Sequence, residues 1–405
     1  MKKKICLLIL LATLFIPTFT SPIKTQQLEA RSQDSKTLSK ASPSSIPFIF
    51  GTRSTQYSID PVDCYYLGDE NIIDQVAETL FTYNYSDPNL PLIPLLATAV
   101  SDISGGGLNY TINLRKNVTF HDGTEFNAIA AKWNFDRMEY WWNFSGALPY
   151  TEYIGSPYPL FYFEDGETPI WNHTEIVGEY AIKFVLNAPF VPLLDVLTYT
   201  ATAMVSPTSH GWDITSPIYP PILPVGTGPF VIDSYIRYKK AKFHAYENYW
   251  REIANISKLI FSYYDYYDGN KLSRDLLESK VHFIDLLCQP FLLDDLKSDP
   301  NITFLDEGKT DSNPLYLIFN NNHLNQTWRE ALSYAINYSE IIKVLSFFGE
   351  GARLKSPVPE GIRYSNYGFN YPNFNITKAR EIMQSMGFGI GWNTTYPGTD
   401  EFLWR

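Results

Sequence analysis

Residues 110–115 alternate between apolar and polar side chains, with Tyr, Ile and Leu separated by Thr and Asn, and an Arg at the end of the run. A period of two is typical of a strand with one buried face. Gly105, Gly106 and Gly107 come directly before this run, and glycine tolerates the backbone angles of a tight turn. The pattern therefore predicts two strands that are joined by a glycine turn.

A second turn and a helix follow this strand. The sequence His-Asp-Gly-Thr at residues 121–124 favours a tight turn in which the Asp side chain hydrogen-bonds to the backbone. Asn127 then stands where a helix over residues 128–138 needs an N-cap. We interpret the His-Asp pair as part of a turn rather than as catalytic residues.

Two further segments show strand patterns next to turn signals. Residues 178–187 alternate and lead to a short predicted helix at residues 191–197. Residues 230–237 and 242–246 alternate as the two strands of a hairpin, after a tight Gly-Thr-Gly-Pro turn at residues 226–229. Because Pro and a strand follow these glycines, this segment is not a nucleotide-binding loop.

Other patterns complete the predicted order of elements. We expect strands at residues 47–51, 258–264 and 283–285, and helices at residues 70–81, 270–279, 328–337 and 376–387. The helix at residues 328–337 is the clearest of these, because its apolar positions recur at i, i+1, i+4 and i+5.

Composition and charge narrow the classes of protein that fit. A chain of 405 residues with 45% hydrophobic residues suggests two or three domains. Aromatic residues make up 16% of the chain, which suits large cores and also the walls of binding clefts. The net charge of −11, without a basic stripe, argues against nucleic-acid binding.

The N-terminal region has the composition of an export signal. Three Lys residues at positions 2–4 precede an apolar run, so residues 1–21 are predicted to be a secretory signal peptide or an N-terminal anchor. Residues 22–45 are polar and predict a flexible linker. The chain is therefore expected outside the cytoplasm, either extracellular or at the cell surface.

Cysteine and sequon usage are compatible with export. Cys64 and Cys288 could pair or remain two separate thiols, and no CxxC motif supports a metal site. Asn-x-Ser/Thr sequons are frequent, which indicates either a surface glycoprotein, as on an archaeal cell, or a polar composition. The sequons begin at Asn84, Asn109, Asn117, Asn143, Asn172, Asn255, Asn301, Asn325, Asn337, Asn375 and Asn393.

Several of these segments, in their order along the chain, resemble one known family. They are the segment PLLA at residues 94–97, YTINLRKNVTFHDGT at 110–124, PVGTGPF at 224–230, and FN at 319–320 followed by WREALSYAIN at 328–337. The chain resembles the extracellular solute-binding proteins of family 5, the peptide- and nickel-type binding subunits of ABC transporters. One departure is Asn-Tyr-Trp at residues 248–250, which lacks a spacer residue of the family pattern.

The resemblance implies a mixed α/β, type II periplasmic-binding-protein fold, with two lobes of mixed sheets flanked by helices. It implies that lobe I comprises residues 46–83 and 205–290, that a family-specific subdomain covers 84–204, and that 291–405 form an incomplete lobe II. The third domain of the family is then incomplete, and we expect a member that is truncated at its C-terminus.

The same resemblance implies a monomeric receptor with no cofactor and no bound metal, which passes an oligopeptide to ABC permease subunits in the membrane. An oligosaccharide receptor and a non-functional gene fragment stay open as alternatives. An enzyme is not expected, because the sequence holds no HExxH, GxSxG or Walker motif.

Candidate ligand contacts come from the resemblance and from residue chemistry. The resemblance places Tyr65 and Tyr66, and the turn at 226–229, beside the cleft, and Trp141 and Trp142 are either aromatic cleft walls or core residues. Arg329 is either a carboxylate ligand or a member of an ion pair on its helix. The complete set of candidate ligand contacts is Tyr65, Tyr66, Trp141, Trp142, Gly226, Thr227, Gly228 and Asn320.

Overall fold

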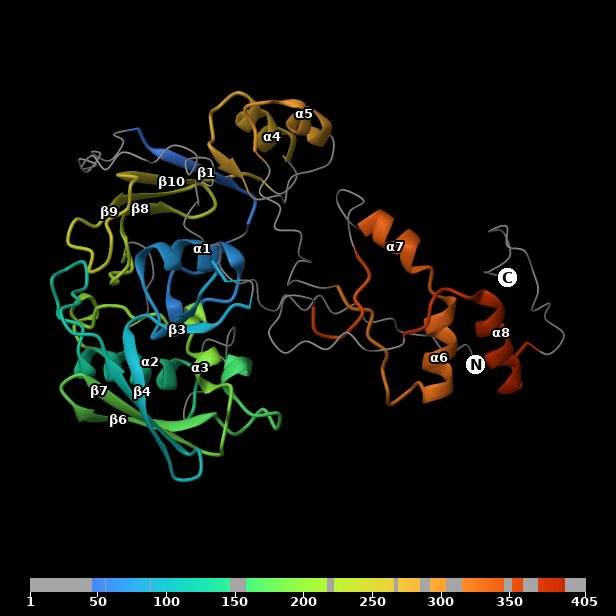
Figure 1. Cartoon of the computed structure of the whole chain (residues 1–405), viewed down its shortest axis with the longest axis horizontal. Helices are drawn as coiled ribbons and strands as arrows, with labels where there is room; N and C mark the ends of the chain where they lie inside the picture. Colours follow the sequence, from blue (N-terminus) through green and yellow to red (C-terminus); the bar gives the residue numbers. More distant parts are fainter. Residues whose placement is uncertain are drawn as a thin grey trace, which may run out of the picture. The chain divides into compact units, whose positions relative to one another are not determined.

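The computed structural model describes residues 46–54, 56–87, 89–145, 158–216, 222–265, 269–284, 292–303, 315–345, 352–359 and 371–389. The signal peptide, the linker and Cys288 lie outside these residues. The described residues fall into two compact units that divide after Ile302 (Figure 1). Each unit is described separately below, and the domain boundaries inferred from the resemblance stay predictions.

The first unit, which ends at Ile302, contains a five-stranded mixed sheet in the order β11-β1-β10-β9-β8. Its strands are β1 (Phe48–Thr52), β8 (Phe230–Ile236), β9 (Lys240–Ala245), β10 (Lys258–Tyr263) and β11 (Phe283–Ile284). Strand β1 runs parallel to both β10 and β11, whereas β9 is antiparallel to β10 and to β8. The predicted hairpin is therefore confirmed, and its strand β9 pairs with β10, which in turn pairs with β1.

A second sheet of four antiparallel strands has the order β4-β5-β7-β6. It comprises β4 (Ala97–Ser104), β5 (Asn109–Leu114), β6 (Trp171–Gly178) and β7 (Ala181–Leu186). Alternate residues of β5 are buried, as the sequence pattern predicts. The turn between β4 and β5 is also confirmed, because its three glycines all have positive φ angles.

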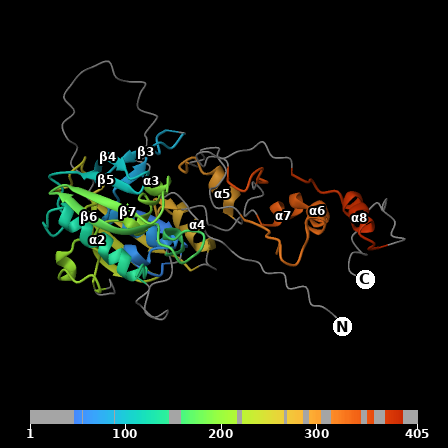
Figure 2. The ribbon, with the colours of Figure 1, turned by 90° about the horizontal axis from the view of Figure 1, so that it is seen from below.

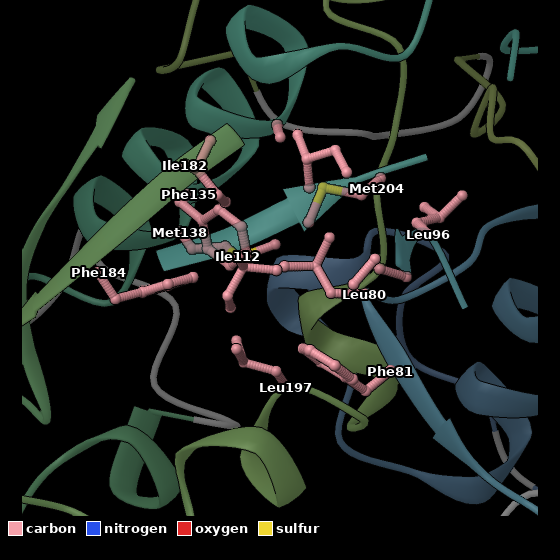
Figure 3. Packing of buried hydrophobic residues seen from close by; sticks show 14 of the residues in the cluster. Leu80, Phe81, Leu96, Ile112, Phe135, Met138, Ile182, Phe184, Leu197 and Met204 are labelled. Carbon is pink, nitrogen blue, oxygen red and sulfur yellow. The ribbon is translucent and has the colours of Figure 1, made fainter. Parts of the chain in front are cut away.

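Helix α2 (Ala128–Trp141) covers the inner face of this sheet (Figures 1 and 2). Asn127 caps it as predicted, since its Oδ1 accepts the backbone N–H groups of Ile129 and Ala130 at 3.0 and 3.1 Å. The helix continues three residues past the predicted end. Figure 3 shows Phe135 and Met138 of this helix packed beside Ile182 in the hydrophobic core.

Helix α1 (Leu67–Val76) corrects the prediction of a helix at residues 70–81. It begins earlier and ends earlier, and the chain then forms β2 (Phe81–Tyr83), which pairs with β3 (Leu92–Pro94). The physical cause is tertiary, because the carbonyl oxygen of Val76 accepts the backbone N–H of Gly228 at 2.8 Å. The next residue, Ala77, has the extended φ and ψ of −127° and 151°.

Helix α1 belongs to both hydrophobic cores of this unit. Ile73 packs in the core formed with the four-stranded sheet, whereas Ile72 and Val76 pack in the core beneath the five-stranded sheet. All three side chains are fully buried. Trp133 of α2 also reaches the second core. The two cores are thus continuous through two helices, which fixes the position of α1 and of the loop that leads into it.

Short helices complete the first unit. They are η1 (Pro61–Asp63), η2 (Tyr158–Phe161), α3 (Leu193–Val196), η3 (Thr200–Thr202), η4 (Thr208–His210), α4 (Gly269–Leu277) and α5 (Leu293–Ser298). Helix α4 confirms the helix predicted at residues 270–279, and it places the buried Leu272 against the backbone of β1.

The described part of the second unit is helical. It contains α6 (Gln326–Ala335), α7 (Tyr338–Leu345) and α8 (Ile376–Ser385), in agreement with the helices predicted at residues 328–337 and 376–387. Helices α6 and α8 pack against each other, and each buries one small side chain, Ala331 and Ala379.

Candidate ligand-binding surface

The loop after β1 lies at a position that commonly holds ligands in α/β proteins. Because β1 is parallel to β10 and β11, the carboxyl ends of these three strands share one edge of the sheet. Ligands of open α/β sheets bind outside the carboxyl ends of the strands. Residues 53–66 leave this edge and lead into α1.

This loop presents three tyrosines in one group. The rings of Tyr57 and Tyr66 lie 4.2 Å apart between centroids, and those of Tyr65 and Tyr66 lie 5.4 Å apart with their planes nearly perpendicular. Tyr57 is 49% exposed and Tyr66 is 37% exposed. Exposed aromatic rings that gather at one place are typical of binding surfaces.

The carboxyl group of Asp69, in the first turn of α1, positions the loop. Its Oδ1 accepts the backbone N–H groups of Tyr57 and Ser58 at 2.6 and 3.0 Å, and its Oδ2 accepts that of Tyr66 at 3.4 Å. Asp69 is fully buried, and this burial raises its pKa to about 7 against the opposing effect of the three hydrogen bonds. One side chain thus holds the backbones of two of the exposed tyrosines.

The turn between β8 and β9 adds two further side chains to the group. The backbone N–H of Tyr238 donates to Oε1 of Gln56 at 3.2 Å, and Nε of Arg237 donates to the carbonyl oxygen of Gln56 at 3.4 Å. Tyr238 is 50% exposed and has a φ of +59°, a strained angle for a side chain of its size. We call Tyr57, Tyr65, Tyr66, Arg237 and Tyr238 the tyrosine surface; Tyr65 is partly buried, and the other four side chains are exposed.

Tyr65 and Tyr66 were singled out by the sequence, and the structure brings them together on this surface. Tyr57, Arg237 and Tyr238 were missed. No sequence signal connects them, because 181 positions separate Gln56 from Arg237 and only the sheet brings the two turns together. A ligand contact at Tyr65 or Tyr66 stays a prediction.

Gly226, Thr227 and Gly228 lie in a packed junction rather than on an open surface. A Cβ atom on Gly226 would lie 2.1 Å from the carbonyl oxygen of Val76, so only glycine fits there. All three residues are buried. His121 also belongs to this junction, because its Nε2 lies 2.9 Å from the carbonyl oxygen of Gly228.

A buried carboxyl group holds the junction together. Glu78 accepts hydrogen bonds from the Thr227 hydroxyl at 2.9 Å, the Tyr249 hydroxyl at 2.7 Å and Nε1 of Trp250 at 2.8 Å. Burial raises the pKa of Glu78, and the three donors oppose this shift. The Gly-Thr-Gly-Pro and Asn-Tyr-Trp motifs therefore meet at one glutamate, which gives both motifs a structural role.

The two tryptophans at the end of α2 differ in their surroundings. Trp142 has no exposed surface, stacks on Phe161 at 3.8 Å between centroids, and donates its Nε1 hydrogen to the carbonyl oxygen of Val62. The sequence left two interpretations of Trp142, a cleft wall or a core residue. The structure places Trp142 in the core and not at the wall of a cleft. Trp141 is partly buried against the same core.

Asn320 and Arg329 lie in the second unit. Oδ1 of Asn320 accepts the N–H of Asn322 at 3.0 Å, and its carbonyl oxygen accepts two further N–H groups, so it forms the turn before α6. Residues 315–320, which lead to this turn, form no helix or strand. Arg329 donates to the carbonyl oxygen of Leu324 and lines an open hollow of about 540 Å³ with Phe319 and Tyr334.

Three further properties concern the described residues only. They contain no group of three or more His, Cys, Asp or Glu side chains that could hold a metal ion. Cys64 is a free thiol that is completely buried. Within the same part of the chain, every helix is too short or too polar to cross a membrane.

Comparison with known proteins identifies the class. Residues 91–403 match the model of the bacterial extracellular solute-binding proteins, family 5, and the chain belongs to this family. The predicted family is therefore confirmed. The family consists of substrate-binding components of transport systems and is not a class of enzymes.

Curated relatives include glutathione-binding proteins. The chain is 29% identical to the glutathione-binding protein GsiB of Pectobacterium atrosepticum over 356 residues, which cover 86% of this chain and 62% of that protein. It is 27% identical to GsiB of Escherichia coli K12 over 350 residues, which cover 84% of this chain and 61% of that protein. The chain thus spans about three fifths of the length of these relatives.

Solved structures share the fold. The Helicobacter pylori protein DppA, in complex with the peptide STSA, superposes with a TM-score of 0.66 at 22% identity and covers 84% of this chain and 66% of that one. NikZ of Campylobacter jejuni, in complex with Ni(L-His), superposes with a TM-score of 0.63 at 22% identity. This match covers 84% of this chain and 63% of NikZ. The mixed α/β, type II periplasmic-binding-protein fold is therefore confirmed.

Proposed function

We propose that this protein is the substrate-binding component of an ABC importer and that it captures short peptides outside the cytoplasm. Membership of the family over residues 91–403 is the observation that carries this proposal. In this role the protein delivers its ligand to a membrane permease and catalyses no reaction. The proposal includes export of the chain, in keeping with a family of extracellular proteins.

The relatives favour a peptide as the ligand. The curated relatives bind glutathione, which is a tripeptide, and one structural neighbour holds the peptide STSA. A second neighbour holds a nickel–histidine complex, so nickel belongs among the ligands to be tested. Peptide-binding sites combine polar groups that meet the ligand backbone with apolar surfaces for its side chains.

The tyrosine surface supports a binding role in the first unit. It combines exposed rings with hydroxyl groups at the carboxyl edge of three parallel strands, and Asp69 fixes its backbone. A rigid aromatic surface with polar tips suits a ligand that has both apolar and polar parts. Tyr66 is the central ring, since it contacts both Tyr57 and Tyr65.

A thermal-shift panel tests the proposal. The purified chain is heated alone and with glutathione, the peptide STSA, di- to pentapeptides, cello- and xylo-oligosaccharides, and nickel. A ligand that binds only the folded protein stabilises it by about 2.7 kcal/mol at 100 times its Kd. We expect the midpoint to rise with peptides. A rise with oligosaccharides and none with peptides contradicts the peptide function and supports a sugar receptor.

A matched pair of variants links the shift to the surface. Tyr66→Ala removes the central ring, and we expect the peptide-induced shift to fall. The control Ile129→Ala removes another exposed apolar side chain, 57% exposed, from α2, outside the tyrosine surface. An unchanged shift in Tyr66→Ala, with the control also unchanged, would place the binding site elsewhere.

A further inference from the structure

Arg237 has a guanidinium group that is only partly used by the protein. It lies in the turn between β8 and β9, and its side chain is exposed. Its Nε donates to the carbonyl oxygen of Gln56 at 3.4 Å. Within the described residues, the two Nη atoms have no hydrogen-bond acceptor. One nitrogen thus anchors the group, and the other two are not used by the described residues.

Two aromatic rings flank this guanidinium group. Its Cζ lies 4.9 Å from the ring centroid of Tyr238 and 5.9 Å from that of Tyr57. Both distances are within the range of a cation–π interaction. Tyr238 keeps its positive φ of +59°, and backbone strain of this kind persists where the surrounding structure requires it. The rings and the Gln56 contact together restrict where the guanidinium group can point.

Charge around Arg237 is unbalanced. No carboxylate of the described residues lies within 4.0 Å of it, although the whole chain carries a net charge of −11. Arg137 shows the contrast, because both of its Nη atoms bind the buried carboxylate of Asp60. Asp69 lies behind the tyrosine surface, but it is buried and accepts three backbone N–H groups.

The geometry points to a carboxylate as the missing partner. A guanidinium group binds a carboxylate through two parallel N–H···O bonds, and ionised partners make such bonds roughly twice as strong as neutral ones. The rings of Tyr238 and Tyr57 lie within cation–π distance of the group and favour its position at this surface. A peptide carries such a group at its C-terminus.

We infer that Arg237 binds the terminal carboxylate of the peptide ligand through its two Nη atoms, between the rings of Tyr57 and Tyr238. This inference rests on the proposed function and adds to it the part of the ligand that is recognised. It makes Arg237 a specificity-determining residue that selects peptides with a free C-terminus.

Paired ligands test the inference by isothermal titration calorimetry. The probes are STSA and glutathione, each compared with its C-terminal amide, which removes one negative charge. The variants are Arg237→Gln, Arg237→Lys and the control Lys239→Gln. Lys239 lies in the same turn and is exposed, so its substitution removes the same charge without the guanidinium group. Melting curves without ligand check that each variant is folded.

The expected result is a loss of discrimination. A hydrogen bond to a charged group contributes enough for about a tenfold or larger preference of the native protein for the acid over the amide. The Arg237→Gln variant should bind the acid and the amide with equal affinity, and this affinity should match that of the native protein for the amide. Arg237→Lys should keep part of the preference, because it retains the charge but not the two parallel bonds. Lys239→Gln should keep all of it.

Two other outcomes lead to different conclusions, one about Arg237 and one about the proposed function. If the native protein binds acid and amide equally, or if Arg237→Gln keeps the preference, the role of Arg237 is overturned while the peptide-binding function stands. If the native protein binds neither probe nor any other peptide of the panel, the proposed function fails, and the inference fails with it.

Discussion

At the scale of single residues, close backbone contacts explain several of the motif positions. Gly226 and Gly228 lie against the last turn of α1, where an added Cβ atom would meet main-chain atoms at 2.1 and 2.7 Å. Main-chain atoms cannot move aside as a flexible side chain can. The motif is therefore needed for packing, whether or not a ligand also lies near it.

Substitution of Gly226 tests this structural role. We expect Gly226→Ala to lower the free energy of unfolding by about 2 kcal/mol or more, because the methyl group overlaps the Val76 carbonyl. The control Gly178→Ala places a methyl group 3.5 Å from its nearest neighbour and should have little effect. Urea unfolding measures both. A Gly226→Ala protein of normal stability that had lost its ligand would instead favour a contact role.

At the scale of elements, a buried ion pair joins α2 to the loop before α1. Arg137 binds the carboxylate of Asp60 with two hydrogen bonds, and its Nε and Nη2 also donate to the carbonyl oxygen of Ser216. The two charged side chains are 1% and 2% exposed. This pair connects three segments that are far apart in the sequence, and Asp60 belongs to the same loop as Tyr65 and Tyr66.

Removal of one partner should leave a buried charge without compensation. We expect Arg137→Met to lower the free energy of unfolding by about 3–5 kcal/mol, because the buried carboxylate of Asp60 then lacks the guanidinium group that balances its charge. Lys132→Met on the same helix breaks only the half-exposed pair with Asp136, so its cost should stay below about 1 kcal/mol. Guanidinium unfolding curves of the two variants check the difference, and equal costs would contradict it.

At the scale of the whole molecule, buried acidic groups make stability depend on pH. Burial raises the pKa of Glu70 and that of Glu139 to about 8. In the unfolded chain both groups ionise near their ordinary value of 4.5. The native state therefore retains protons that the unfolded state has lost, and stability must fall as pH rises through about 8.

The expected pH profile has a definite sign. Between pH 7 and 8.5 the free energy of unfolding should decrease, with a slope of up to about 1.4 kcal/mol per pH unit for each group. This window lies above the pKa values of His121 and His210, which burial lowers, so these groups do not contribute. The double variant Glu70→Gln/Glu139→Gln should reduce this slope, and Asp69 and Glu78, whose pKa values burial also raises, should supply the slope that remains. A stability that rises with pH in the native protein would contradict this assignment.

The two units of the chain also differ from each other in how much of each is buried. The first unit has two large hydrophobic cores, whereas among the described residues after Ile302 only a few side chains, such as Ala331 and Ala379, are buried. The chain spans 62% of the length of its P. atrosepticum relative. The tyrosine surface belongs to the first unit, whose cores hold its loops in place.

Local patterns were enough to predict most elements. The alternation at residues 110–115, the cap at Asn127 and the hairpin at residues 230–246 depend on neighbours in the sequence, and the structure confirms all three. The family could also be predicted from the sequence, because its motifs keep fixed spacings along the chain. Such features are determined by backbone preferences and side-chain periodicity, which act over a few residues.

Only the tertiary structure decided the end of α1, the burial of Trp142 and the composition of the tyrosine surface. Val76 ends its helix where its carbonyl accepts a hydrogen from Gly228, and Arg237 reaches Gln56 across the sheet. No local pattern encodes these contacts, because each depends on strand order and on the packing of helices between two cores. The sequence by itself determined the elements and the family, and the arrangement of the strands determined which side chains meet.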